Sequence, residues 1–184
     1  MYAADTSKKI RAVVQAKAKA GERVTTNPPY GYLKDSRNPK NWIIDPVASE
    51  VVKRIFQEAK SGKSLSEIAK GLENDKIFKP DRHRIEIGLK SISSSPNVET
   101  LPYFWIRETL SAILSREEYL GHTVNLRTRT KSYKDKRKLD NPKEGWLIFK
   151  NTHEAIIDQE TFDIVQKMRS HKRSNQRYKN RAGH

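Results

Sequence analysis

The residue types that most often carry catalysis are present in this sequence, but their spacing does not assemble a reaction centre. The five histidines are scattered, and none has a histidine or a suitable carboxylate three or four positions away with which to share a metal ion. The neighbouring acids Glu117 and Glu118 would diverge by about 100° on a helix, which makes them a poor acid and base pair. We therefore expect no metal, no cofactor and no catalytic residue in this chain.

Other sequence signals of chemistry are missing as well. The chain has no cysteine, which excludes disulfides, thiol catalysis and zinc held by cysteine. It has no glycine-rich phosphate loop and no Gly-x-Ser-x-Gly elbow, and we interpret the serines of 91–96 as a linker. His153 is expected to be a hydrogen-bonding anchor at a strand-to-helix corner rather than a general base.

The charge of the chain predicts a polyanionic partner. Its 184 residues include 37 Lys and Arg against 22 Asp and Glu, a net charge of +15. Segment 45–78 is neutral, whereas 121–151 carries nine basic and three acidic residues and 169–184 carries six basic residues and no acid. Basic segments placed on both sides of a neutral centre favour phosphate contacts, which would make binding salt-dependent. Charge alone does not separate DNA from RNA or acidic lipid.

The elements that would position such contacts begin with helices and one hairpin. Alternating apolar positions predict a helix over 7–20 and a β-hairpin from 30–33 and 42–44. Asp45-Pro46 is a typical helix start, and the apolar period that follows predicts a helix ending at Gly62. No run approaches 18 apolar residues, so a membrane span is excluded, and no secretory leader opens the chain.

The centre of the chain has the pattern of an interrupted helix-turn-helix. Ser64-Leu65-Ser66-Glu67 is a capping box that opens a short helix over 64–74, as in the positioning helix of that motif. The reading helix should follow after a few residues, yet the next suitable helix, 105–114, begins 32 residues after Leu72. Its expected outward positions are Arg107, Glu108, Ser111 and Ala112.

The second half of the chain predicts short strands and basic loops. We expect strands over 123–126 and 146–149, and a capping box from Ser115 and Glu118. Segments 79–84 and 127–143 are interpreted as basic loops, and a last helix should follow Asp158, with an unstructured basic tail beyond Ser170. The expected fold class is α+β in one compact core: mostly helical, an interrupted helix-turn-helix-like centre, small β-hairpins and basic arms.

An ordered set of short motifs resembles one protein family. The motifs are Ser7-Lys8-Lys9-Ile10-Arg11; Gly21; Pro29-Tyr30-Gly31-Tyr32; Ile44-Asp45-Pro46 with Val51-Val52 and Ile55-Phe56; Gly62-Lys63-Ser64 with Ile68-Ala69 and Leu72; Trp105 with Thr109, Ile113-Leu114 and Tyr119-Leu120-Gly121; and His153-Glu154-Ala155-Ile156-Ile157-Asp158 with Phe162 and Val165-Gln166. Over roughly residues 5–170 this order is similar to the recombinase domain of large serine recombinases, the serine integrases and related transposases.

The resemblance implies a division of the chain and a role. It implies the end of a linking helix and linker at 1–23, the DNA-binding domain at 24–170 and a basic linker or tail at 171–184. In the family, a separate domain carries the serine that cuts DNA through a phosphoserine link, and a cysteine-ligated zinc domain follows. The chain is thus expected to be a fragment that binds DNA without cutting it. It would be monomeric, in the cytoplasm with the nucleoid of a bacterium or phage host, while its parent self-associates on DNA.

The resemblance and the basic segments together nominate the residues that contact DNA. By position, the helix at 105–114 would read the groove, the segment before Tyr30 would cross towards the minor groove, and the tail would lie along the duplex. The nominated residues are Arg23, Thr25, Lys79, Arg82, Arg84, Arg107, Thr109, Ser111, Arg127, Arg129, Lys131, Lys172, Arg173 and Arg177.

Two other functions fit parts of the sequence. An RNA-binding module of ribonucleoprotein type would carry the same charge, and structured RNA outcompeting duplex DNA would favour it. A complete small nuclease would need a metal or nucleophile cluster that the sequence does not contain. We therefore expect a domain that recognises part of an attachment-site or transposon-end half-site in duplex DNA.

Overall fold

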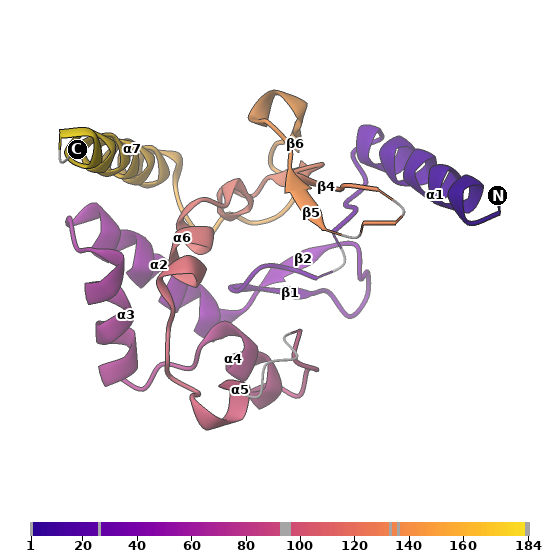
Figure 1. Ribbon diagram of the computed structural model, residues 1–184. Helices are drawn as coiled ribbons and strands as arrows, with labels where there is room; N and C mark the ends of the chain where they lie inside the picture. Colours follow the sequence, from indigo (N-terminus) through magenta and orange to yellow (C-terminus); the bar gives the residue numbers. More distant parts are fainter. Residues whose placement is uncertain (1, 26, 93–96, 133, 136, 183–184) are drawn as a thin grey trace. The chain divides into compact units, whose positions relative to one another are not determined.

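The computed structural model describes residues 2–25, 27–92, 97–132, 134–135 and 137–182, with the side chains of 2–4 and 172–182 outside the description. Its elements group into two compact units rather than the single core that the sequence predicted. The first unit combines Met1–Ile44 with Glu117–Ala155, and the second combines Asp45–Arg116 with Ile156–His184 (Figure 1). Each unit is therefore built from two stretches of chain that are distant in sequence.

The first unit consists of one long helix and three small antiparallel strand pairs. The pairs are β1–β2, β3–β6 and β4–β5 (Figure 1). The elements are α1 (Tyr2–Lys19), β1 (Tyr32–Lys34), β2 (Trp42–Ile44), the 3-10 turn η1 (Glu117–Leu120), β3 (Thr123–Asn125), β4 (Thr128–Thr130), β5 (Lys138–Asp140), the 3-10 turn η2 (Lys143–Gly145) and β6 (Leu147–Phe149). The predicted hairpin at 30–44 and the predicted strands at 123–126 and 146–149 are confirmed.

Aromatic side chains build the core of this unit. Tyr32 and Trp42, which leave β1 and β2 on the same side, are both buried, and Tyr32 lies against Tyr119 with ring centroids 6.1 Å apart. The Tyr119 hydroxyl donates to the Tyr30 carbonyl at 2.8 Å. Burying these large rings with their hydroxyls bonded gives a small unit both apolar area and fixed geometry, so the hairpin packs on the core as expected.

One glycine of this unit is required by its surroundings. Gly121 has φ +82°, and a Cβ placed on it would lie 2.5 Å from the backbone oxygen of His153. Any larger residue would have to push the two segments apart, because that oxygen belongs to the main chain. Gly121 thus allows the turn before β3 to approach the segment after β6.

The second unit is helical. Its elements are α2 (Pro46–Lys60), α3 (Leu65–Asn74), α4 (Pro80–Glu86), α5 (Asn97–Thr100), α6 (Arg107–Leu114) and α7 (Gln159–Ala182). The predicted start of α2 is confirmed, since the Asp45 side chain accepts from the backbone N–H groups of Val47 and Ala48. The apolar face of α2 includes Ile55 and Phe56, both fully buried, and α2 packs against α3, α6 and α7. This helix is the centre of the unit.

The predicted interruption of the helix-turn-helix is confirmed. The capping box at Ser64 and Glu67 opens α3, and α3 packs against α6 although 32 residues, 75–106, separate them. The indole N–H of Trp105 donates to the Ile77 carbonyl at 2.9 Å, which joins the start of the excursion to its end. α3 and α6 can therefore act as neighbours while α4 and α5 lie in the connection.

The segment at 79–84 is a helix and not the loop that the sequence predicted. Pro80 occupies the first position of α4, where its missing N–H costs nothing. The buried His83 Nε2 lies 2.7 Å from Asp45 Oδ2, so α4 is attached to the N-terminus of α2. This long-range bond, which spacing along the chain does not reveal, fixes the helix.

Three further expectations were wrong. Ser115 is the C-cap of α6, and its hydroxyl donates to the Ala112 carbonyl instead of opening a new helix. The basic loop at 127–143 contains the β4–β5 hairpin. The tail is helical rather than unstructured, since α7 continues to Ala182, in keeping with the good helix propensity of its Arg, Lys and Gln residues. The part of the Ser91–Pro96 linker at 93–96 lies outside the described residues. Over the described residues, no helix has the length and hydropathy of a membrane span.

Candidate functional site

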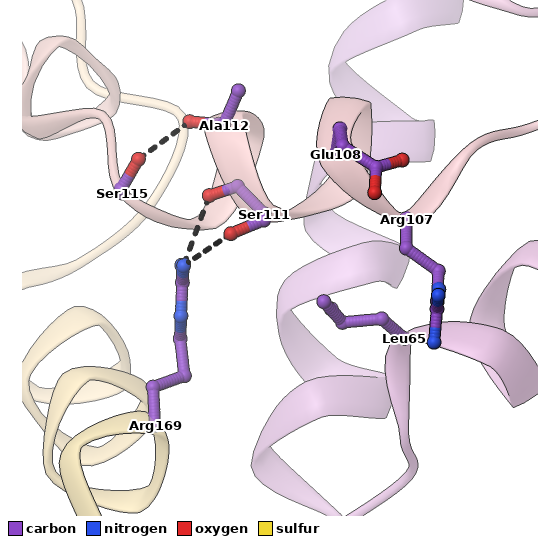
Figure 2. Close-up of a pocket in the computed structure, with 7 residues that line it drawn as sticks. All are labelled: Leu65, Arg107, Glu108, Ser111, Ala112, Ser115 and Arg169. Atoms are coloured by element: carbon purple, nitrogen blue, oxygen red, sulfur yellow. Dashed lines mark hydrogen bonds between the residues drawn. The ribbon is translucent and has the colours of Figure 1, made fainter. Parts of the chain in front are cut away.

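The exposed side of α6 forms one wall of an open groove in the helical unit. The groove has a volume of about 510 Å³, and the four outward positions predicted for α6 all line it. Its lining residues come from α3, α6 and α7 and are Leu65, Arg107, Glu108, Ser111, Ala112, Ser115 and Arg169 (Figure 2). The opposite side of α6 is buried through Leu110, Ile113 and Leu114, so packing fixes which residues face outward.

The first turn of α6 presents two opposite charges. Arg107 and Glu108 are its first two residues, both are exposed, and both line the groove (Figure 2). Within the described part of the chain, neither side chain has a hydrogen-bond or ion-pair partner. They are therefore available for an external ligand, Arg107 as a donor and Glu108 as an acceptor. Thr109, also nominated by the sequence, is partly exposed on the same helix.

Arg169 holds the other end of the groove. One terminal nitrogen of its guanidinium donates to the Ser111 backbone oxygen at 3.0 Å and to the Ser111 hydroxyl at 2.9 Å (Figure 2). One turn earlier on α7, the Gln166 side chain donates to the Leu114 carbonyl at 2.6 Å. Because both bonds reach α6 from α7, they fix the position of α6. Sequence reasoning missed Arg169, although it lies four positions after the buried Val165 and so on the inward face of its helix.

Arg23 is engaged inside the first unit. Its guanidinium carbon lies 3.7 Å from the centroid of the Trp42 ring. The guanidinium donates to the Lys40 carbonyl at 2.8 Å and the Thr123 hydroxyl at 3.0 Å, and it lies 3.0 Å from His153 Nδ1. Burial lowers the pKa of Arg23 from its ordinary value. These contacts give Arg23 a packing role that requires no DNA.

His153 is the hydrogen-bonding anchor that the sequence predicted. Its Nε2 lies 2.9 Å from the Glu118 carbonyl, which can only accept, so Nε2 carries the proton and Nδ1 accepts from Arg23. Burial lowers the pKa of His153 to about 4, and the nearby Arg23 charge lowers it further, against the raising effect of the Glu118 bond. The ring is thus neutral at pH 7 and serves as a joint between segments.

The three nominated residues around α4 also contact their own unit. Lys79 donates through Nζ to the Asn97 carbonyl, and Arg82 pairs with Glu86 at 2.9 Å. Arg84 donates through Nε to the Lys90 carbonyl at 3.2 Å. All three side chains remain partly exposed, so phosphate contacts from α4 stay a prediction.

The nominated residues of 127–131 differ from one another. Arg127 pairs with the buried Glu118 at 3.2 Å and lies over the Trp146 ring, whereas Lys131 pairs with Asp135 at 3.5 Å. Arg129 is exposed on β4. The structure therefore separates one exposed cation of this segment from two that have acidic partners.

The remaining nominated residues lie at the ends of their units. Thr25 is exposed in the segment between α1 and β1. Lys172, Arg173 and Arg177 belong to the last turns of α7, and their side chains lie outside the described residues. No group of His, Asp and Glu that could hold a metal ion occurs among the residues that the structure describes.

Comparisons with known proteins converge on one family. The model of the family described as Recombinase matches residues 46–172, which is more than half of the chain. A structure named "Crystal Structure of a LSR-DNA Complex" has a TM-score of 0.50 and 15% identity over 89% of this chain and 38% of that one. A second, "Sequence Requirements of the Listeria innocua prophage attP site", has a TM-score of 0.50 and 15% identity over 88% of this chain and 51% of that one.

These structures show the fold, and they are longer than this protein. The chain spans about two fifths and one half of the two structures it resembles. No curated protein sequence matches it. The α+β fold predicted from the sequence and the resemblance to recombinase domains are both confirmed.

Proposed function

Because the chain belongs to the Recombinase family, we propose that it is the sequence-specific duplex-DNA-binding domain of a site-specific serine recombinase. It would recognise part of an attachment-site or transposon-end half-site during DNA integration or excision. The chain binds DNA, and the serine that cuts DNA belongs to another part of the parent protein. It binds as a monomer, and the parent self-associates on DNA.

The groove beside α6 is the observation that carries the proposal. Its wall begins with Arg107 and Glu108, whose side chains have no partner in the described part of the chain. Hydrogen-bonding side chains on the outward face of a fixed helix are what direct readout of base edges in the major groove requires. Arg107 is suited to the guanine edge, since arginine donates to guanine O6 and N7.

The rest of the charge supplies affinity without sequence information. Phosphate contacts account for half or more of the hydrogen bonds in protein–DNA interfaces, and they fix register and orientation. The net charge of +15 and the basic segment at 169–184 fit this role. Both solved structures named above concern a recombinase with its DNA, which supports duplex DNA over RNA as the ligand by analogy of fold.

The test is binding to three nucleic acids across a salt series. The protein is titrated against a labelled attachment-site half, a shuffled duplex of the same composition and a hairpin RNA. We expect the half-site to bind most tightly, with a ratio over shuffled DNA that persists as salt rises, because base contacts release few counterions. Equal affinities that vanish together with salt would refute sequence recognition, and a preference for the hairpin would support the RNA-binding module instead.

A second assay tests the absence of cutting. Supercoiled plasmid incubated with the protein and magnesium should remain supercoiled, since no metal-binding cluster occurs among the described residues. Relaxed or linear product would revive the small nuclease.

A further inference from the structure

The β4–β5 hairpin has no buried face. All six residues of its two strands are exposed, and they pair only with each other, in the register Thr128 with Asp140, Arg129 with Leu139 and Thr130 with Lys138. A two-stranded ribbon without a packed face is marginally stable alone in water. An external surface that covers the hairpin would therefore stabilise it.

Internal contacts fix the base of this hairpin. The Asn141 backbone N–H donates to the Arg127 carbonyl at 2.8 Å, and the Asn141 side chain donates to the Leu126 carbonyl at 2.7 Å. Arg127 itself is held by Glu118. The direction in which the ribbon leaves its unit is thus set by the fold.

The tip is closed by a second set of bonds. Arg137 grips Asp135 with two nitrogens, Nε at 3.0 Å and a terminal nitrogen at 2.6 Å, and Lys131 pairs with the same carboxylate. The Arg137 bond holds the pKa of Asp135 below its usual range. The cations at both ends of the ribbon are therefore engaged with acids of the same unit.

Two cations in the strands remain. Arg129 and Lys138 are exposed, and within the described residues neither has a hydrogen-bond or ion-pair partner. Successive side chains of a strand point to opposite faces, and paired residues share a face. Lys138 shares its face with Thr130, and Arg129 shares the other with Leu139. The acid Asp140 lies on the Lys138 face, one pair of residues nearer the base.

Cations on both faces fit a groove better than a flat surface. A ribbon that lies flat on one phosphate strand can use only one of its faces. The major groove of DNA is about 12 Å wide, admits a two-stranded ribbon, and has a phosphate strand on either side. We propose that the β4–β5 hairpin enters a DNA groove with Arg129 on one flanking phosphate strand and Lys138 on the other. This inference rests on the proposed function, and it adds a second point of contact to α6.

The test measures the salt dependence of binding for charge-removing variants. Arg129→Gln, Lys138→Gln and the double variant are titrated against the half-site and the shuffled duplex. Lys40→Gln is the control, because it removes the same charge from an exposed lysine whose partner is Glu22. Urea unfolding checks that each variant folds. Each hairpin substitution should make the slope of log affinity against log salt shallower by about 0.9, and the double variant by about twice that.

The results separate the hairpin from the reading helix. Additive loss of slope on both duplexes, with Lys40→Gln unchanged, supports insertion between two phosphate strands. Unchanged slopes, or a loss in only one of the single variants, would overturn it. Failure of the unsubstituted protein to prefer the half-site would instead refute the proposed function, and the slope comparison on shuffled DNA would still decide the hairpin.

Discussion

Replacing Arg107 by alanine separates recognition of DNA from stability of the fold. The side chain is exposed, lies at the first position of α6 and has no partner among the described residues. Removing it should change the free energy of unfolding by no more than about 0.5 kcal/mol. The sign should favour the variant slightly, since a cation at a helix N-terminus opposes the helix dipole.

The expected effect on recognition is much larger. Losing a side chain that bonds a base edge costs about 1–3 kcal/mol on the cognate site, which is about 5- to 160-fold in affinity. Binding to shuffled duplex should change little, because Arg107 is assigned to bases and not to phosphates. Fluorescence anisotropy on both duplexes at a fixed salt concentration, with urea unfolding of the same samples, measures both quantities.

Arg169 in the same groove is the matched control. Arg169→Ala removes the two bonds to Ser111, which join α7 to α6. Hydrogen bonds from a charged group contribute about 1.5–3 kcal/mol, so this variant should lose about 2 kcal/mol of stability and about 4–8 °C in Tm. Equal loss of affinity on half-site and shuffled DNA would refute the reading role of Arg107, as would destabilisation comparable to that of Arg169→Ala.

Three other predictions concern the ends, the helix start and the aromatic unit. Deletion of 171–184 should weaken binding to every duplex and flatten its salt dependence, and an unchanged slope would show that this segment does not contact phosphates. Asp45→Ala should cost about 2–4 kcal/mol in urea unfolding, because it removes a helix cap and the partner of buried His83. Ser64→Ala, which removes an exposed cap, should cost about 1 kcal/mol, and equal losses would contradict the Asp45 assignment. Because the pKa of His153 is lowered to about 4 by burial, the unfolded state binds more protons between that pKa and its ordinary value of 6.5. The contribution of His153 to stability should thus be complete above pH 6.5 and fall by about 1 kcal/mol from pH 7 to pH 5, after allowance for its partial exposure, and a decline as large in His153→Asn would contradict this.

Local signals in the sequence predicted the elements that depend on nearest neighbours. Asp45-Pro46 and the capping box at Ser64 and Glu67 mark helix starts, since a cap satisfies N–H groups two or three residues away. The apolar period through Ile55 and Phe56 predicted the buried face of α2, and the four outward positions of α6 follow from the same period. The order of motifs was enough to indicate the family.

Tertiary contacts decided the features that the sequence did not reveal. Segment 79–84 is dense in charge and looked like a loop, yet the bond of His83 to Asp45, 38 residues away, holds it as a helix. Arg23 looked like a phosphate contact, but Trp42 and His153 surround its guanidinium. Likewise, Arg127 and Arg129 are alike in sequence, and only Arg127 is paired with Glu118.

The sequence by itself determined the fold class, the family and the outward face of the reading helix, because periodicity and capping act over a few residues. The structure decided which cations remain available to a ligand. That depends on acids and rings brought near from distant parts of the chain, such as Glu118 for Arg127 and Trp42 for Arg23. A basic residue is recognisable from its type, whereas its partner is set only when the chain has folded.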